Sequence, residues 1–285
     1  MVIRLILLLL AVHPKGTLFI VGGGPQPPAL VKHFVELAGG THARIVVFGM
    51  ASSDGVTTGV EKAQELHSYG AEAFNLFITP AEANTDSVIR QLSTITGVWF
   101  SGGDQVKLMA ALRGTRVDSL IHAKYRAGAV IAGTSAGAAV MSTPMITGDE
   151  RRRGGDRPPT DSNDIFMTIA RGNIVTASGF GLIEGAVVDQ HFIRRRRNNR
   201  LLSVVLEGPV HLGVGIDEST ALIVHPDGRW SVEGASAAVI YDARHARINA
   251  SDATALGAAG VVVDVLPAGS TFDPSTGRVL VLGKG

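Results

Sequence analysis

Residues 128–141 constrain the fold of this chain more than any other segment. They read Gly-Ala-Val-Ile-Ala-Gly-Thr-Ser-Ala-Gly-Ala-Ala-Val-Met, an apolar run that enters a turn made almost entirely of small residues. The pattern predicts a buried strand, a sharp turn at Ser135 and then a helix. Because so tight a turn brings its two flanking backbones together, the residues beside the serine must be small.

The same turn fits a pattern found in hydrolases. Gly133-Thr-Ser-Ala-Gly137 matches G-x-S-x-G, the nucleophile elbow, which exposes its serine at the positive end of the following helix. So short a pattern also occurs in turns that only pack a helix on a sheet. The match therefore gains meaning only if the chain also supplies a base and an orienting carboxylate.

Strand and helix signals alternate through the first half of the chain. Strands are expected at residues 17–21, 43–50, 73–78 and 97–101, and helices at 29–38, 55–69, 85–93, 106–112 and 117–126. This alternation predicts an α/β fold with a mostly parallel, doubly wound sheet of the flavodoxin-like kind. Ligands bind such sheets beyond the carboxyl ends of the strands, where the loops at 22–25 and 102–105 meet the Ser135 turn.

The second half of the chain has a different character. A strand is expected at residues 182–189, a basic helix at 194–206, a strand at 212–216 and a hairpin around His225-Pro-Asp-Gly228, followed by short β segments. We therefore expect an antiparallel β extension from about residue 225, within one α/β domain that covers residues 16–285. The polar stretch 148–172 is expected to be a surface loop that borders a substrate groove.

Composition excludes several classes of function. The 285 residues include no cysteine, which removes disulfides, thiolate metal sites and cysteine nucleophiles. A formal net charge of +1 gives no reason to expect a nucleic-acid or membrane partner. Residues 1–15 hold a short apolar run after one arginine, too short to span a bilayer and without a cleavage pattern. They are interpreted as a signal or an N-terminal extension, which leaves both the cytoplasm and export open.

A serine nucleophile needs a histidine that accepts its proton. Among nine histidines, His191 differs because it follows the apolar pair Val187-Val188, at the expected end of a strand. A buried structural histidine is the ordinary explanation for such a residue taken alone. Its position at a strand end nevertheless makes His191 the candidate base.

The orienting carboxylate has two candidates, Asp217 and Glu218, which follow the expected strand at 212–216. An unpaired carboxylate at the end of a buried strand is costly, so a site is a reasonable explanation. Neighbouring residues of a strand point to opposite faces, so only one of the two faces the site. The spacing does not say which.

Four segments together carry a specific resemblance. They are Gly102-Gly-Asp-Gln105, Gly133-Thr-Ser-Ala-Gly-Ala138, Asp189-Gln-His-Phe192 with the arginines that follow it, and Gly215-Ile-Asp-Glu-Ser-Thr-Ala221. In this order they resemble the cyanophycinases, which are serine peptidases with a class I glutamine-amidotransferase-like α/β fold. The resemblance runs from Gly16 into the late β region.

The resemblance implies a catalytic serine at Ser135, a histidine at His191 and a glutamate at Glu218, and so selects Glu218 over Asp217. The serine attacks an amide carbonyl, the histidine transfers the proton and the glutamate orients the imidazole. Backbone N–H groups of Ala136 and Gly103 are expected to form the oxyanion hole. No metal and no organic cofactor are expected.

The family's substrate is cyanophycin, a polyaspartate with arginine on each β-carboxyl group, which is cleaved to β-Asp-Arg dipeptides. The residues expected to bind this substrate are polar and lie in the matching motifs: Gln105, Asp189, Gln190, Arg195, Arg197 and Arg200. Arginine binds carboxylates in a bidentate manner. Four consecutive arginines at 194–197 cannot share one helix face, so about two at most are expected to point inward. The family also suggests a homodimer.

Three alternatives stay open. The first is a related aspartyl dipeptidase that cleaves small α-aspartyl peptides. The second is a non-catalytic binding protein on the same fold. The third is a nucleotide-binding protein that uses Gly22-Gly23-Gly24, which is weaker because this cluster lacks the G-x-G-x-x-G spacing.

Overall fold

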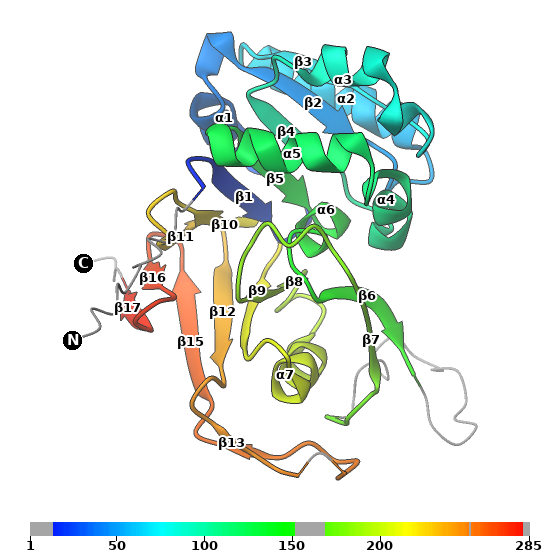
Figure 1. The fold of residues 1–285 in the computed structure, drawn as a ribbon. Coiled ribbons are helices and arrows are strands. Elements are labelled where there is room, and N and C mark those ends of the chain that lie inside the picture. Colours follow the sequence, from blue (N-terminus) through cyan, green and yellow to red (C-terminus); the bar gives the residue numbers. More distant parts are fainter. Residues whose placement is uncertain (1–13, 152–168, 251, 282–285) are drawn as a thin grey trace, which may run out of the picture.

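The computed structural model describes residues 14–151, 169–250 and 252–281 (Figure 1). The chain contains a nine-stranded sheet, in the order β17-β16-β11-β10-β1-β5-β4-β2-β3, and the end of this sheet that carries β1 to β5 forms the upper part of the molecule as drawn. A four-stranded sheet, in the order β15-β12-β9-β8, lies below it. The candidate site residues are carried by both sheets.

Five strands of the nine-stranded sheet are parallel: β1 (Thr17–Val21), β2 (Arg44–Phe48), β3 (Glu72–Asn75), β4 (Gly97–Phe100) and β5 (Val130–Thr134). Alternate residues of each strand enter two different cores: Phe19 and Ile45 lie in one, Leu18 and Val46 in the other. Burial on both faces explains the continuous apolar runs of the sequence.

Helices cover both faces of these strands, as expected. One face is covered by α1 (Pro28–Leu37) and α2 (Gly55–Ser68), the other by α3 (Asp86–Leu92), α4 (Gln105–Leu112) and α5 (Arg116–Ala127). Local signals fix several ends: Thr85 caps α3 by accepting from Val88 N–H, and Gly128, at φ 118°, ends α5. The mostly parallel, doubly wound α/β fold is confirmed.

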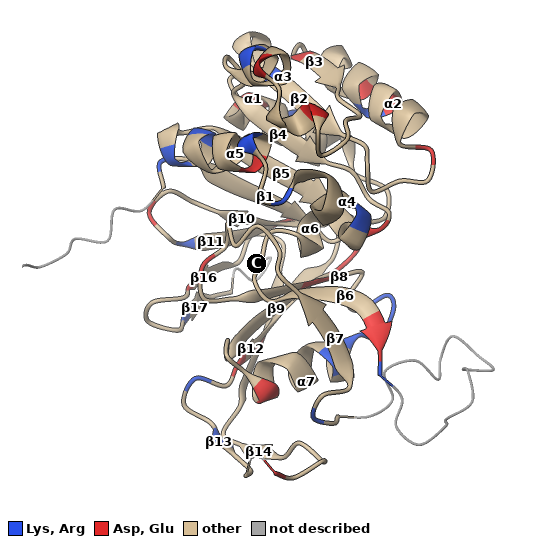
Figure 2. Ribbon diagram, turned by 45° about the vertical axis from the view of Figure 1, so that its right-hand side comes forward, with Lys and Arg blue, Asp and Glu red and all other residues tan. Residues whose placement is uncertain are grey.

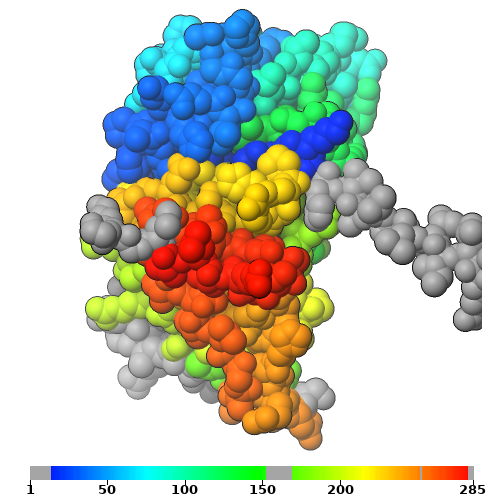
Figure 3. All heavy atoms as spheres, turned by 90° about the vertical axis from the view of Figure 1, so that its left-hand side faces the viewer, coloured from blue at the N-terminus to red at the C-terminus, as the bar shows by residue number. Residues whose placement is uncertain are grey.

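Antiparallel strands extend the sheet beyond β1. They are β10 (Thr220–Val224), β11 (Trp230–Gly234), β16 (Thr271–Asp273) and β17 (Arg278–Leu280). Figure 3 shows the last of these, in red, below the blue N-terminal half. The expected antiparallel C-terminal strands are present, and they begin with β10 rather than at about residue 225.

The four-stranded sheet combines the parallel pair β8 (Val187–Gln190) and β9 (Leu212–Ile216) with antiparallel β12 (Ala237–Asp242) and β15 (Val262–Pro267). One face shares a core with the large sheet, through residues such as Val188 and Val214. Helix α7 (Asn198–Glu207) packs on the other face. The sequence did not indicate that these strands form a sheet of their own.

Two expected elements differ from the structure. The strand expected at 182–189 is limited to β8, and the helix expected from residue 194 begins only at Asn198. Residues 192–197 form turns, and Arg196 has a positive φ of 52°, which a right-handed helix does not accommodate. The arginines at 194–197 therefore precede the helix and do not share its faces.

The remaining elements are short. They are α6 (Ala136–Ala139), the 3-10 turns at Gly40–His42 and Glu82–Asn84, the hairpin of β6 (Met145–Glu150) and β7 (Ile174–Ala177), and the pair β13 (Arg247–Ile248) and β14 (Ala258–Ala259). The surface loop expected at 148–172 thus begins and ends on a hairpin, and residues 152–168 of it lie outside the described residues.

Residues 1–13 of the expected leader also lie outside the described residues, and the single domain over 16–285 stays a prediction. Within the described ranges, no helix combines the length and apolar character that a bilayer crossing requires. Charged side chains of both signs are interspersed along helices such as α3 and α5 (Figure 2).

Candidate functional site

Ser135 lies in the turn between β5 and α6, with φ 54° and ψ −111°. A positive φ is uncommon outside glycine and marks a backbone held by its surroundings. A Cβ at Gly133 would lie 2.3 Å from the carbonyl oxygen of Gly137, and one at Gly137 would lie 2.2 Å from that of Phe100. The close approach of these backbones explains why the residues beside the serine are small.

One side chain reaches this serine, and a second side chain holds the first. His191, which follows β8, has its Nε2 2.9 Å from Ser135 Oγ. Its Nδ1 lies 2.6 Å from Oε1 of Glu218, which lies between β9 and β10. The histidine side chain is buried, whereas Glu218 is partly exposed. A hydroxyl, an imidazole and a carboxylate thus form one continuous hydrogen-bonded chain where the two sheets meet.

Asp217 points the other way. Its carboxylate accepts hydrogen bonds from the backbone N–H of Arg194 (2.9 Å) and from Ser236 Oγ (2.8 Å). The two adjacent carboxylates face opposite sides of the turn that follows β9. Of the two carboxylates that the sequence left as alternatives, only Glu218 contacts His191.

The backbone of the glycines at 22–24 packs directly against His191 and Glu218. Gly22 O accepts from the backbone N–H of His191 (2.6 Å) and Gly23 O from that of Ser219 (2.8 Å). A Cβ at Gly23 would lie 2.3 Å from the imidazole of His191, and one at Gly24 would lie 2.8 Å from Cβ of Glu218. The cluster that was weighed as a nucleotide site is therefore occupied by the protein's own side chains. The sequence signal for this close packing was the run of three consecutive glycines at the end of the first strand.

The surroundings of His191 lower its pKa below the ordinary value. Burial is the largest cause, and the positive charges of Arg195 and Arg197 act in the same direction. The hydrogen bond that His191 donates to Glu218, and the negative charge of Glu218, oppose this shift without reversing it. The imidazole is consequently neutral at neutral pH, the form that accepts a proton.

Two backbone N–H groups, those of Ala136 and Gly103, are the expected oxyanion-hole donors near Ser135. Among the described residues, no oxygen accepts a hydrogen bond from the N–H of Ala136 or of Gly103. The loop after β4 adjoins the serine, since a Cβ at Gly102 would lie 3.4 Å from Ser135 Cβ. Gly103 has φ 134° and packs against the carbonyl of Ala51, which leaves no room for a side chain. Both N–H groups therefore stay candidates for the expected oxyanion hole.

Asp189 and Arg200 do not lie where a substrate could reach them. Arg200 Nε donates to Oδ2 of Asp189 at 2.8 Å, and Nη2 donates to Oδ1. The two side chains are 0% and 1% exposed, the signature of a buried ion pair. This corrects the expectation that they bind substrate, because each already satisfies the charge of the other.

Hydrogen bonds within the protein also involve the side chains of Gln105, Gln190 and Arg197. Gln105 donates to the carbonyls of Ile146, at 2.8 Å, and Thr147, which ties the β6–β7 hairpin to α4. Arg197 donates to the backbone oxygen of Gln190 at 2.8 Å and to its Oε1 at 2.6 Å. Burial, followed by the neighbouring charge of Arg200, lowers the pKa of Arg197 to about 10. Their contact with substrate stays a prediction.

Arg195 differs from the other five residues expected to bind substrate. Its side chain is exposed and has no hydrogen-bonded partner among the described residues, while its backbone N–H donates to His191 O at 2.9 Å. Its charge is close enough to His191 to lower the pKa of the imidazole. It is therefore a cation beside the Ser135–His191 pair that is available to an incoming anion.

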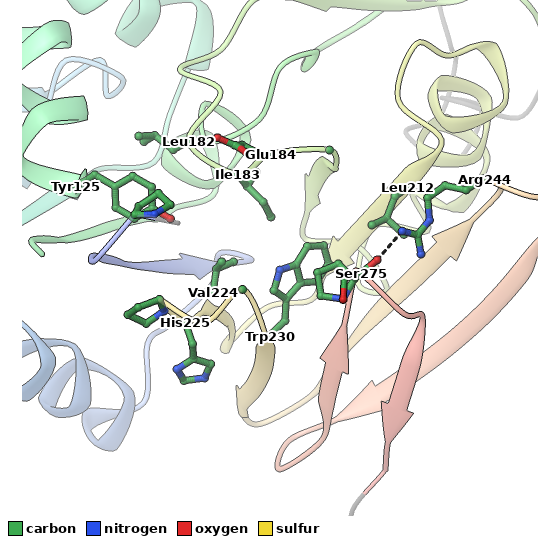
Figure 4. A pocket seen from close by; sticks show the side chains of 15 residues that line it. Tyr125, Leu182, Ile183, Glu184, Leu212, Val224, His225, Trp230, Arg244 and Ser275 are labelled. Atoms are coloured by element: carbon green, nitrogen blue, oxygen red, sulfur yellow. Dashed lines mark hydrogen bonds between the residues drawn. The ribbon is translucent and has the colours of Figure 1, made fainter. Parts of the chain in front are cut away.

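A separate pocket lies at the ends of the strands opposite to Ser135, beside Pro14, the start of β9 and the end of β10 (Figure 4). Its volume is about 280 Å³, and its walls include Tyr125, Glu184 and Trp230. Burial, with a smaller effect of Glu184, raises the pKa of Tyr125 to about 12. None of the residues that the sequence assigned to the site lines this pocket.

Comparison with known proteins identifies the family. The model of peptidase family S51 matches residues 18–230. The cyanophycinase of Trichormus variabilis is 33% identical over 234 residues, which cover 80% of this chain and 74% of that protein. The cyanophycinase of Synechococcus elongatus is 31% identical over 236 residues, covering 81% and 69% of the two chains.

Solved structures show the same fold at lower identity. A peptidase from an acI-B1 actinobacterium superposes with a TM-score of 0.65 at 21% identity, over 92% of this chain and 98% of that one. A putative peptidase E protein from Listeria monocytogenes gives a TM-score of 0.52 at 19% identity, over 78% and 99%. Since the family model covers residues 18–230, well over half of the chain, the chain belongs to peptidase family S51, as a cyanophycinase-like serine peptidase.

Proposed function

We propose that this protein cleaves the polyaspartate backbone of cyanophycin to β-Asp-Arg dipeptides, with Ser135, His191 and Glu218 as its catalytic triad. The observation that supports this most directly is the hydrogen-bonded chain from Ser135 Oγ to His191 Nε2 (2.9 Å) and from His191 Nδ1 to Glu218 Oε1 (2.6 Å). The strand, turn and short helix around Ser135 have the arrangement of a nucleophile elbow.

In the proposed reaction, Ser135 Oγ attacks the carbonyl carbon of a backbone amide while His191 Nε2 takes the hydroxyl proton. The N–H groups of Ala136 and Gly103 donate to the oxyanion that forms, and each such donor contributes about 3 kcal/mol of transition-state stabilisation. His191 then gives its proton to the leaving amine. Water, activated by the same histidine, hydrolyses the acyl-enzyme and restores the serine.

The proposed substrate is supported by the charge beside His191 and by sequence similarity to cyanophycinases. Cyanophycin offers carboxylates and guanidinium groups, and Arg195 is an exposed cation next to His191. A guanidinium binds a carboxylate through two parallel hydrogen bonds. Relatives at 31–33% identity carry the name cyanophycinase.

The first test is dipeptide release from purified cyanophycin, measured by mass spectrometry. We expect wild-type protein to release β-Asp-Arg and Ser135→Ala to lower the rate by about 10⁶-fold, because the nucleophile is lost. Ser68→Ala, a change at an exposed serine of α2, is the matched control and keeps the wild-type rate.

Two other outcomes would replace this proposal. Cleavage of α-aspartyl dipeptides without release from cyanophycin would identify an aspartyl dipeptidase. Binding of cyanophycin that is unchanged by Ser135→Ala, with no cleavage of either substrate, would identify a non-catalytic binding protein.

A further inference from the structure

A polar cluster lies behind the triad, on the α1–α2 side of the sheet. Gln26, in the loop between β1 and α1, donates from Nε2 to the carbonyl oxygen of Gly24 at 2.5 Å and to Thr134 Oγ1 at 3.4 Å. Its Oε1 accepts from Lys62 Nζ, on α2, at 2.9 Å. Neither residue belongs to the triad, the expected oxyanion hole or the expected substrate contacts.

Both backbone segments that Gln26 connects support the triad. Gly24 packs against Glu218, since a Cβ at Gly24 would lie 3.0 Å from Oε2 of that carboxylate. Thr134 immediately precedes Ser135 in the turn with positive φ. The amide group of Gln26 therefore links the backbone that packs against Glu218 to the end of β5, which leads into Ser135.

Lys62 determines which way this amide faces. An ammonium group can only donate, so the amide oxygen of Gln26 must face Lys62 and its NH₂ must face Gly24 and Thr134. Lys62 is itself held, because its side chain is only 13% exposed, pairs with Glu65 and lies over the ring of Trp99, 4.6 Å from the centroid. A cation fixed in this way leaves the amide one satisfied orientation.

We infer that Gln26, oriented by Lys62, is a positioning residue for Ser135 and Glu218, an inference that rests on the proposed function of this triad. Gln26 acts through the backbone of Gly24 and the side chain of Thr134 and does not touch substrate. Its loss loosens the relative placement of nucleophile and acid. Rates then fall more than substrate affinity, because misplacement of about 1 Å can cost about 100-fold in rate.

The test uses side chains of similar length without hydrogen-bonding groups: Gln26→Met, Lys62→Met and the double variant. The probe is phenylmethylsulfonyl fluoride, a small reagent whose reaction with Ser135 is timed by intact mass spectrometry, alongside kcat and KM on cyanophycin. We expect Gln26→Met to lower the labelling rate and kcat by about 10- to 100-fold, with KM within about twofold of wild type. Lys62→Met lowers them less.

The double variant separates a linked pair from two independent contributions. If Lys62 acts through Gln26, the double variant is no slower than Gln26→Met alone. Multiplied losses would overturn that link. Gln64→Met and Lys32→Met, at exposed positions of α2 and α1, are the matched controls and keep wild-type rates.

A second variant protects the test against misfolding. Gln26→Glu keeps the contact with Lys62 but turns an acceptor toward the carbonyl of Gly24, so we expect the same loss of rate with a cooperative thermal transition. Labelling within about twofold of wild type in both Gln26 variants would overturn the positioning role. Wild-type protein that is not labelled at Ser135 would overturn the proposed function as well, which distinguishes the two failures.

Discussion

At the scale of single residues, the imidazole of His191 is held by contacts on several sides. Its imidazole is buried, bonded at both nitrogens, and supported from behind by the backbone of Gly23. Burial and two nearby arginines outweigh the effect of Glu218, so the pKa of the imidazole is lowered. The lowered pKa favours the neutral imidazole, the form that the proposed role of His191 as a base requires.

The pH dependence of Ser135 labelling follows from these charges. Arg195 disfavours the imidazolium, so Arg195→Met raises the pKa of His191 and moves the acid limb of the labelling profile to higher pH. We expect a shift of less than about one pH unit, because Arg195 is exposed and screened by salt. Arg194→Met, a neighbouring exposed arginine, is the control; equal profiles for both variants would contradict the electrostatic explanation.

Gly23 offers a test of the close approach at the site. In Gly23→Ala the new methyl group would lie 2.3 Å from the imidazole of His191, so we expect labelling of Ser135 to fall by more than about 100-fold. Gly185→Ala provides the control: its φ of 69° is also strained for alanine, but no atom lies within 4 Å of the added Cβ. That variant should lose about 1 kcal/mol of stability and keep its labelling rate.

At the scale of elements, a buried ion pair fixes β8 against α7. Asp189, in β8, and Arg200, in the first turn of α7, share two hydrogen bonds away from water. Since β8 leads directly into His191, this pair sets the direction from which the base approaches. The motif residues thus serve the site through structure as well as through chemistry.

Breaking this pair should destabilise the fold. Arg200→Met removes the bidentate partner of the buried Asp189 carboxylate and leaves Arg197, whose Nη1 lies 4.0 Å from Oδ1. Breaking a buried ion pair in this way typically costs about 3–5 kcal/mol in the free energy of unfolding, measured with urea. Arg229→Met, which breaks the exposed pair with Asp227, should cost less than about 1 kcal/mol. Unchanged stability in Arg200→Met, with a raised KM, would instead restore the role of Arg200 in substrate binding.

At the scale of the whole molecule, the sequence predicted one sheet far better than the other. The parallel strands β1 to β5 were found because strands buried on both faces appear as continuous apolar runs between helices of regular period. The sheet of β8, β9, β12 and β15 was not, because short strand signals do not indicate which sheet they join. Ser135 was predicted from the G-x-S-x-G turn and His191 from its place at a strand end, while Glu218 needed the family resemblance to distinguish it from Asp217; the structure brings the three together, and their catalytic roles stay predictions.

The errors have a common physical origin. Asp189 and Arg200 are polar residues in a functional motif, and sequence alone does not distinguish a substrate contact from a salt bridge with a residue 11 positions away. The roles of Gln26 and of the glycines at 22–24 depend on contacts with residues that are distant in sequence. The homodimer stays a prediction, which light scattering on the purified protein would decide.

The positions of the three candidate residues along the chain also determine the order in which they are synthesised. Ser135 precedes His191 by 56 residues, and Glu218 follows His191 by 27 residues. At about 5–20 residues per second, a ribosome exposes the serine several seconds before its partners exist. If Ser135 is the proposed nucleophile, a nascent or prematurely terminated chain carries it without its histidine and glutamate. The proposed triad can then form only after synthesis has passed Glu218 and the two sheets have packed together.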